Sequence, residues 1–516
     1  MQQIKVGKYT LESLTTGMYE NPEIIYREYI QNSVDSIEEA VKNNILKIEE
    51  SRINIILSEM ENKIIISDNG MGISENNAFY VLTDIGNSSK KYENNRGFRG
   101  IGRLGGLSFC EKLRFISKYK GEENESLLEY DCVKLKRLLV PGENDHYDLE
   151  NVLREVVTFE KRGAKKIEDH YFIVELEGID IFTDLLDIDK MKSYIKQTCP
   201  LPYKRFVYKK DIHDLFKNNN RELLEFNIYM GSDKENLEQL YKPVKYNFKS
   251  NVKSKNDDFI NEIKTIQIYD QGELLAIGWY GKCNYYGTII DKEIAGIRIR
   301  KGNILVKSSR IINQVFKEPR FNGWVQGEVF ILSYKIIPNA RRDDFEPNIT
   351  YYNLIKGLEK KLGEQIQAEI RQESRFRNSN IKKTITDINI SMNKSKELEG
   401  KGFAYKGQKE KSLQELNKKK QNLEKAKPQN TKEDNLKRET LDKVEKTIEI
   451  IEKSNNYKTN KLKGVISKKE RKILDNVSES MLNILLKYLS DEEQVNKIID
   501  EVIESVESAL LGRDKK

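Results

Sequence analysis

Residues 21–41 read NPEIIYREYIQNSVDSIEEAV, and this stretch has the periodicity of a helix with two different faces. Asn21 is a suitable N-cap, and Pro22 suits the first position of the helix. At about 100° per residue, the apolar side chains fall on one side of such a helix. These side chains are Ile30, Val34, Ile37 and Val41. The pattern predicts a helix whose apolar side packs on a sheet.

The opposite face of the predicted helix aligns Glu28, Asn32 and Asp35. Their spacing of i, i+4 and i+7 places a carboxylate, an amide and a second carboxylate in one narrow arc. An isolated pattern of this kind is more often a solvated helix face. The stretches that follow along the chain favour a functional site instead.

Composition indicates a protein of several domains without a membrane segment. The chain has 516 residues, of which 33% are charged, and its mean hydropathy is −0.68. That length predicts two to four domains. No apolar run is long enough to span a bilayer, and the first residues contain no apolar signal core, so we expect a cytoplasmic protein. The few cysteines and histidines are scattered, which argues against disulfides and against a Cys- or His-based metal site.

The net charge of +7 is concentrated in one segment. Residues 371–476 contain 29 Lys/Arg against 16 Asp/Glu, a net of +13, whereas residues 1–370 contain 55 against 57, a net of −2. A basic segment can bind an acidic partner such as nucleic acid. A solvated helix rich in Lys and Glu explains the same composition equally well.

A hairpin is predicted after the helix, because residues 53–57 and 63–67 are β-branched runs joined by a polar turn. The second run ends in Asp68-Asn69-Gly70-Met71-Gly72. The two glycines permit tight or left-handed backbone conformations just after a carboxylate at the strand end. That carboxylate can accept a hydrogen bond from an exocyclic amine such as that of adenine. An ordinary turn has the same pattern.

A glycine-rich stretch follows a polar segment, residues 73–96, which suits a mobile loop. Residues 96–107 read RGFRGIGRLGGL and contain five glycines within ten residues. Because glycine has no side chain, such a backbone can wrap around a phosphate chain with its N–H groups facing the anion. A flexible glycine loop is the simpler alternative. Residues 111–120, EKLRFISKYK, predict the next strand.

The order of these motifs resembles the GHKL ATPase superfamily, which includes Hsp90, DNA gyrase B, MutL, MORC proteins and histidine kinases. The motifs are E-x-x-x-N-x-x-D on a helix, D-x-G-x-G after a strand, a polar loop, and G-x-x-G-x-G. The resemblance implies a Bergerat-fold ATPase domain over residues 1–178 that binds ATP and Mg²⁺. The Gly-Thr pair usual before a late strand of that domain is not evident in this sequence.

The resemblance also implies a role for individual residues. Glu28 matches the general base, Asn32 the Mg²⁺ ligand, Asp35 a supporting polar residue, and Asp68 the carboxylate that reads adenine. The other residues placed in the nucleotide site are Gly70, Gly72, Ser88, Lys90, Gly97, Phe98, Arg99, Gly100, Ile101 and Gly102.

Residues 179–350 are expected to form a second, transducer-type domain. A connecting helix over residues 179–203 precedes strand-like runs at 264–271, 274–281, 295–306 and 327–337. The block is similar to the S5-like α/β middle domain of Hsp90, and PNARRD stands where Hsp90 has an Asn–Arg–acid motif. On that match Arg342 reaches the γ-phosphate, with Arg341 as the alternative. A surface salt bridge to Asp343 or Asp344 would explain both arginines without such a role.

The rest of the chain is expected to be helical. Residues 351–377 predict one amphipathic helix at the start of a basic helical arm that covers residues 351–477 and is expected to form a helical hairpin or a coiled coil. Glycines at 400, 402 and 407 and Pro428 interrupt this arm. Residues 478–516 predict a C-terminal helical element that dimerises or packs back on the second domain. The predicted fold is therefore α/β, an α+β sandwich followed by a helical region.

The function that these resemblances imply is a Mg²⁺·ATP-dependent conformational ATPase. It would close and form a homodimer on ATP, and would clamp or remodel a protein partner. Bacterial Hsp90-like proteins of this size often belong to defence or stress modules. The alternative is a DNA-binding clamp of the MutL or MORC kind, which the basic arm favours. A histidine kinase is disfavoured because no histidine precedes Glu28, and a non-enzymatic scaffold is disfavoured because the motif residues are intact.

Overall fold

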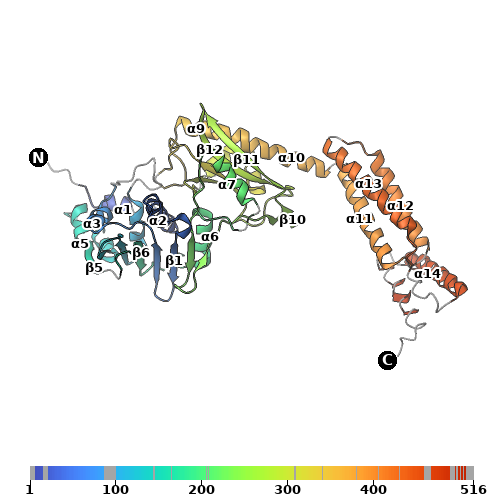
Figure 1. Ribbon diagram of the computed structural model, residues 1–516, viewed down its shortest axis with the longest axis horizontal. Coiled ribbons are helices and arrows are strands. Elements are labelled where there is room, and N and C mark those ends of the chain that lie inside the picture. Colours follow the sequence, from blue (N-terminus) through green and yellow to red (C-terminus); the bar gives the residue numbers. More distant parts are fainter. Residues whose placement is uncertain are drawn as a thin grey trace, which may run out of the picture. The chain divides into compact units, whose positions relative to one another are not determined.

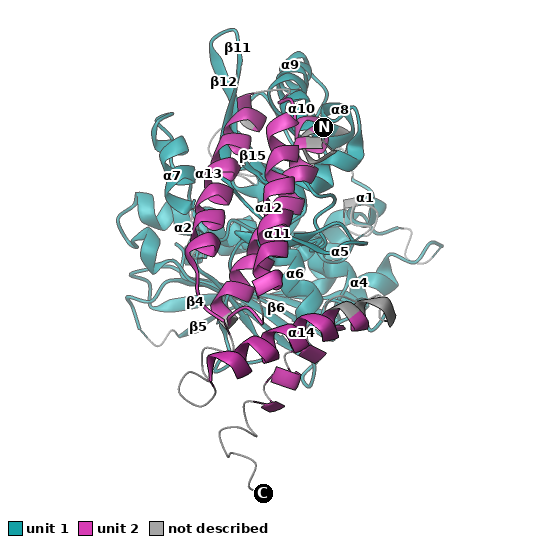
Figure 2. Ribbon diagram, turned by 90° about the vertical axis from the view of Figure 1, so that its right-hand side faces the viewer, with its two compact units in different colours: residues 1–370 teal, residues 371–516 magenta. Residues whose placement is uncertain are grey.

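The computed structural model describes most of the chain in two compact units, residues 1–370 and residues 371–516 (Figure 2). The described residues are 6–14, 21–86, 100–142, 146–163, 166–204, 206, 208–306, 309–339, 341–378, 380–404, 406–428, 431–457, 467–488, 494–495, 498–499, 501–503 and 505–506. The first unit is mixed α/β and the second is helical, which confirms the predicted fold class.

The first sheet of unit 1 has eight strands in its described part, and β1 pairs with β7 in parallel while all other neighbours are antiparallel. In spatial order the strands are β5 (Val157–Gly163), β4 (Asn124–Asp131), β3 (Lys112–Lys118), β6 (Tyr171–Glu177), β2 (Lys63–Asp68), β1 (Ile53–Ser58), β7 (Ile228–Gly231) and β8 (Glu238–Gln239).

The hairpin of β1 and β2 forms as predicted. Ile53 lies opposite Asp68 and Ser58 lies opposite Lys63, so Asp68 ends its strand at the open end of the hairpin. Alternate side chains of the pair, including Ile55 and Ile66, are buried on one face. This period of two fixes the register, because a slip of one residue would turn the apolar set toward the other face.

Helices cover the apolar face of this sheet, and Figure 1 shows α1, α2 and α3 on one side of the strands labelled β1, β5 and β6. They are α1 (Tyr9–Leu14), α2 (Ile24–Lys42), η1 (Ile48–Glu50), α3 (Glu75–Thr83), η2 (Gly102–Ser108), α4 (Cys132–Leu138), α5 (Leu149–Val156) and α6 (Ile188–Thr198). The predicted apolar face of α2 is confirmed, since Ile30, Val34 and Ile37 are fully buried.

Two of these helices differ from the sequence prediction at their ends. α2 begins at Ile24, because Asn21 and Pro22 form a tight turn in which their carbonyls accept from Ile24 N and Ile25 N. The connecting helix α6 is shorter than the predicted residues 179–203 and begins only after Asp187, whose side chain caps it by accepting from Lys190 N.

A second sheet follows in unit 1, in the order β11 (Glu262–Asp270), β12 (Glu273–Lys282), β15 (Gln326–Ile331), β13 (Gly296–Lys301) and β14 (Ile304–Leu305). Beside it are β9 (Asn247–Ser250), β10 (Asn256–Phe259), α7 (Lys209–Lys217), α8 (Ser309–Val315) and η3 (Pro319–Trp324). All four predicted strand runs are found, but the last one ends at Ile331 instead of continuing to residue 337. The run at 295–306 is a pair of short strands, because Gly302 and Asn303 adopt left-handed conformations that turn the chain.

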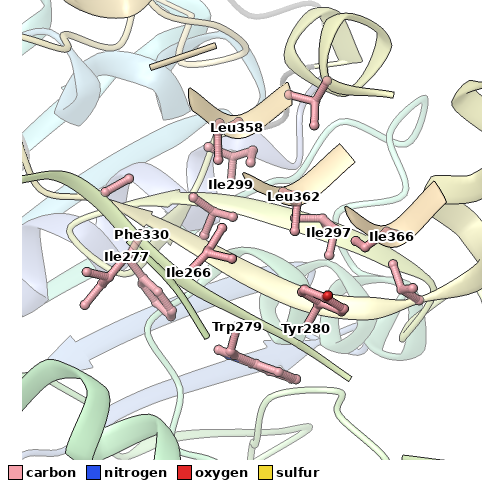
Figure 3. Close-up of a cluster of buried hydrophobic side chains, with 14 of the residues drawn as sticks. Ile266, Ile277, Trp279, Tyr280, Ile297, Ile299, Phe330, Leu358, Leu362 and Ile366 are labelled. Carbon is pink, nitrogen blue, oxygen red and sulfur yellow. The ribbon is translucent and has the colours of Figure 1, made fainter. Parts of the chain in front are cut away.

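One side of the second sheet is covered by α9 (Ile349–Leu358) and α10 (Glu364–Asn378). Leu358, Leu362 and Ile366 lie toward Ile297 and Ile299 of the sheet (Figure 3). The single helix predicted for this segment is interrupted by a π-helical turn, η4 (Glu359–Gly363). The chain packs closely at this turn, since a Cβ on Gly363 would lie 1.9 Å from the carbonyl oxygen of Val315.

The second unit contains α11 (Asn380–Lys401), α12 (Lys406–Lys425), α13 (Thr431–Lys453) and α14 (Lys468–Tyr488). The first three pack against one another in pairs around Ile388, Leu416, Leu423 and Val444. The predicted hairpin arm is therefore a bundle with a third helix. Of the predicted glycine breaks, only Gly402 ends a helix, with a φ of 86°. Among the described residues, no helix is both long and apolar enough to cross a membrane.

Candidate active site

The polar face of α2 is buried. Glu28 is 8% exposed and Asp35 is 6% exposed, and Asn32 between them is half-buried. A solvated helix face would leave both carboxylates in water, because burying an ionised group is costly unless it has partners. The burial therefore excludes the simpler interpretation for Glu28 and Asp35.

The two carboxylate oxygens of Glu28 have different surroundings. Oε1 accepts hydrogen bonds from Arg27 Nη2 at 3.0 Å and Arg27 Nε at 3.2 Å, and it lies 3.8 Å from Arg342 Nε. Oε2 faces Gly102, where an added Cβ would lie 2.4 Å from this oxygen. One oxygen is thus held by arginines while the other is directed at the glycine turn.

Asp68 is placed beside α2 by the loop that follows β2. Its Oδ1 accepts from Gly70 N at 2.9 Å, which orients the carboxylate at the end of the strand. The loop packs on α2 at Ser36, because a Cβ on Gly70 would lie 2.3 Å from Ser36 Oγ, and Met71 N donates to Ser36 O. Ser36 follows Asp35, so the second motif meets the first at this point of the helix.

Gly72 fixes the other side of the same loop. Its φ is +67°, and a Cβ here would lie 2.1 Å from the carbonyl oxygen of Lys118, so no other residue fits without moving the main chain. His170 Nδ1 lies 2.8 Å from Gly70 O. His170 precedes β6, in the region where the usual Gly-Thr pair is not evident, and no sequence motif predicted its contact with the D-x-G-x-G loop.

The third motif is described only from Gly100 onward. Gly100 has a φ of +70°, Ile101 is buried, and Gly102 packs on Glu28 as above. The hydroxyl of Tyr29 donates to Arg103 O and accepts from Gly106 N, which ties η2 to α2. The predicted site residues Ser88, Lys90, Gly97, Phe98 and Arg99 lie outside the described residues.

Arg342 reaches Glu28 from a loop that follows β15. Asn339 organises this loop: its Oδ1 accepts from Asp343 N and Asp344 N, and its carbonyl accepts from Arg342 N. Arg342 takes a left-handed φ of 54° in this turn. The neighbouring Arg341 is exposed, and its carbonyl accepts from Arg27 Nη2 at 3.1 Å. The two arginines of the motif thus contact the α2 site in different ways.

The residues present fit a nucleotide with its magnesium ion. At Gly70, Gly72 and Gly102 a Cβ would meet Ser36, the Lys118 carbonyl and Glu28, so the main chain itself packs closely around the two carboxylates. Asn32 supplies an amide oxygen one turn after Glu28. No group of three or more His, Cys, Asp or Glu residues in the described part of the chain could hold a metal. A magnesium ion bound through phosphate oxygens needs only one or two protein ligands.

Several residues of this site have no signature in the sequence motifs. Arg27, Tyr29 and Ser36 are on α2 between or beside the motif positions, and Arg103 follows the last motif glycine. Their places next to the motif residues could be read from the sequence, but their contacts with other segments could not be predicted.

Comparison with known families agrees with this geometry. The model of the family described as histidine kinase-, DNA gyrase B- and HSP90-like ATPase matches residues 19–154. That range includes α2, the β1–β2 hairpin and the glycine turn. A search of the curated proteins finds no matching relative. The chain therefore contains an ATPase domain of the GHKL superfamily in its N-terminal part.

Proposed function

We propose that this protein binds ATP with Mg²⁺, hydrolyses it, and couples hydrolysis to a change in its second sheet region through Arg342. The observation that supports the proposal is the 3.8 Å approach of Arg342 Nε to Glu28 Oε1, between residues more than three hundred positions apart. If Glu28 activates the attacking water, the γ-phosphate lies within a few ångströms of Glu28. Arg342 is then within reach of that phosphate as well.

Glu28 is the proposed general base. Its Oε2 lies against the glycine turn, beside the place proposed for the phosphates, and would accept the proton of the attacking water. Arg27 holds Oε1 through two hydrogen bonds and so fixes the orientation of the carboxylate. A well-placed base of this kind contributes about 10²- to 10⁴-fold to the rate.

The other motif residues would hold the nucleotide. Asn32 would be the protein ligand of Mg²⁺, which when bound neutralises phosphate charge during transfer. Asp68, oriented by Gly70 N, would accept the adenine amine, and Gly72 would let the base approach the main chain. Asp35 lies next to the contact of Ser36 with the D-x-G-x-G loop and would support it.

A conformational output is supported by the connection between the two sheets. α6 contacts α2 on one side. At its C-terminal end, the carbonyls of Gln197 and Thr198 accept from the guanidinium of Arg300 in β13. If the second sheet moves together with Arg342, the contact of Arg300 with α6 would therefore move α6 as well. ATP-driven closure, homodimer formation and clamping of a partner protein, as in Hsp90, form the rest of the proposal, and a defence or stress setting stays a prediction.

The decisive experiment compares ATP turnover of the wild type with Glu28→Ala. We expect turnover to fall by at least about 100-fold while the ATP dissociation constant, measured by calorimetry, changes by less than about threefold. Turnover near that of the wild type would refute the role of Glu28.

The role of Arg342 is tested against its neighbour. Arg342→Ala should slow hydrolysis about 10- to 1000-fold with little loss of ATP affinity, because a cation at the γ-phosphate acts mainly on the transition state. Arg341→Ala is the matched control, since it removes an adjacent and exposed guanidinium. If Arg341→Ala shows the larger loss, the sensor is Arg341.

A DNA-binding clamp is the second candidate, and one observation favours it. α12 has seven lysines against three glutamates, whereas α13 has six basic against seven acidic residues. Lys411, Lys418 and Lys425 repeat every seven residues and are exposed, so they lie on one side of α12. Stimulation of ATP turnover by double-stranded DNA would favour this candidate over a switch that acts on a protein.

A further inference from the structure

Arg103 follows the glycine turn directly, and its side chain extends from that turn to a different element. Its Nη2 donates a hydrogen bond to the carbonyl oxygen of Asp84. Asp84 is the C-cap residue of α3. The contact therefore joins the end of α3 to the start of η2, two segments that lie on opposite sides of residues 87–99 in the sequence.

The C-terminal end of α3 is held by two side chains. Besides the contact of Arg103 with Asp84, the hydroxyl of Tyr130 in β4 donates to Leu82 O at 2.9 Å. The last carbonyls of a helix have no partners within the helix, and its negative end favours a nearby cation. Burial lowers the pKa of the Arg103 guanidinium, and Tyr130 and Asp84 oppose this shift. An arginine stays charged at neutral pH even so.

The main chain of Arg103 is held from the opposite direction. Tyr29 Oη donates to Arg103 O at 3.2 Å and accepts from Gly106 N at 3.0 Å. Tyr29 is fully buried and follows Glu28 in α2. Arg103 is thus tied to α3 by its side chain and to α2 by its carbonyl oxygen.

The glycine that precedes Arg103 packs on the proposed base. A Cβ on Gly102 would lie 2.4 Å from Glu28 Oε2 and 3.3 Å from Glu28 Cδ, so there is no slack between the turn and the carboxylate. Because Gly102 and Arg103 are adjacent, a shift of Arg103 would also change the distance between Gly102 and the Glu28 carboxylate.

We propose that Arg103 is a positioning residue that fixes the glycine turn between α3 and α2 and thereby sets the separation of Gly102 from the carboxylate of Glu28. The connection of the glycine turn to α3 through Arg103 does not depend on the proposed function. Its effect on catalysis rests on the proposed ATPase function. The two parts can be tested separately.

The catalytic part is tested with Arg103→Met, which keeps most of the volume and removes the donor. We expect kcat to fall at least about tenfold with KM and ATP affinity within about threefold, since a small misplacement of a reacting group costs rate more than binding. Arg103→Lys can still donate to Asp84 O and should recover most of the rate. Arg154→Met, at an exposed arginine of α5, is the control and should match the wild type.

The link is tested by hydrogen exchange without nucleotide. Arg103→Met should raise the rate of amide hydrogen exchange both in a peptide over residues 78–84 and in one over residues 102–107, while β2 stays protected. Arg103→Lys should show exchange rates close to those of the wild type in both peptides. Tyr29→Phe removes the contact from the other side, so it should slow turnover in the same way. Combined with Arg103→Met, it should give less than the product of the single effects.

Three outcomes would overturn the inference: a kcat of Arg103→Met within about twofold of the wild type, parallel losses of kcat and ATP affinity, or exchange that rises evenly over the unit. If the wild type itself shows no turnover, the proposed function fails. The exchange experiment then decides by itself whether Arg103 links the turn to α3.

Discussion

At the residue scale, Asp68 is the clearest test of nucleotide binding. Asp68→Asn keeps the shape but removes the charge and replaces one acceptor oxygen by a donor. A hydrogen bond to a charged group contributes about 1.5–3 kcal/mol, so we expect ATP to bind about 10- to 100-fold more weakly. Calorimetry measures this change, and an unchanged melting temperature would show that the fold is intact. Equal affinity in the two proteins would refute the adenine role.

A second single residue, Glu328, matters for stability. It is fully buried beside Arg300 and Lys242, with Lys242 Nζ at 3.1 Å from its Oε2. Burial favours a raised pKa for Glu328, but Arg300 and Lys242 outweigh it and lower the pKa to about 2 from the usual 4.5. In the unfolded chain the Glu328 carboxylate therefore becomes protonated near pH 4.5, whereas in the native state it stays ionised at that pH. The stability due to Glu328 is present above that pH and is lost as pH falls from 4.5 toward 2.

Glu328→Gln should accordingly lower the free energy of unfolding at pH 7 by about 3–5 kcal/mol, because it leaves buried cations without their partner. It should also flatten the acid dependence between pH 5 and 3, which denaturant titration at several pH values can measure. Glu238→Gln, at an exposed carboxylate paired with Lys192, is the control and should cost less than about 1 kcal/mol. Equal effects of the two substitutions would contradict this explanation.

At the element scale, the two glycine motifs respond differently to a methyl group. At Gly102 the added Cβ would meet the end of the Glu28 side chain, whereas at Gly72 it would meet the main chain at Lys118 O and the φ is positive. Gly102→Ala should therefore displace the carboxylate and reduce turnover at least about tenfold with less than about 1 kcal/mol of destabilisation. Gly72→Ala should destabilise the domain by more than about 2 kcal/mol.

Thermal melts and ATP turnover of the two alanine variants test this difference directly. A loss of stability in Gly102→Ala as large as that in Gly72→Ala would mean that the glycine turn is a structural element. A stable Gly72→Ala variant would mean that the D-x-G-x-G loop can move away from β3.

At the scale of the whole molecule, the question is what the basic second unit contacts. Charge reversal of Lys411, Lys418 and Lys425 to Glu should weaken binding to double-stranded DNA at least about tenfold and reduce the slope of log K against log salt by about 2–3. The matched control reverses three exposed lysines of α13, Lys443, Lys446 and Lys453, and should have a smaller effect. Equal effects would indicate nonspecific attraction, and a wild type without DNA affinity would remove the second candidate.

Much of the fold could be predicted from local pattern. The hairpin, β3, the four strand runs of the second sheet and the apolar side of α2 follow from periodicities of two and 3.6, which neighbouring residues determine. The predictions differ from the structure within residues 73–96, where the helix α3 (Glu75–Thr83) occupies part of the predicted loop, and at the ends and junctions of helices. The residues before Ile24, the π-helical turn at Glu359–Gly363 and the third helix of the bundle depend on packing against distant segments, and packing overrides local preference.

The sequence by itself determined which side chains could do chemistry: Glu28, Asn32 and Asp35 share a helix face, and glycines stand where the main chain must be bare. These conclusions need only spacing along the chain and the allowed backbone conformations. Only the tertiary structure decided that Arg342 meets Glu28 on one oxygen and that Gly102 meets it on the other. Such contacts join segments far apart in sequence, and burial of the two sheets and their helices fixes where those segments meet.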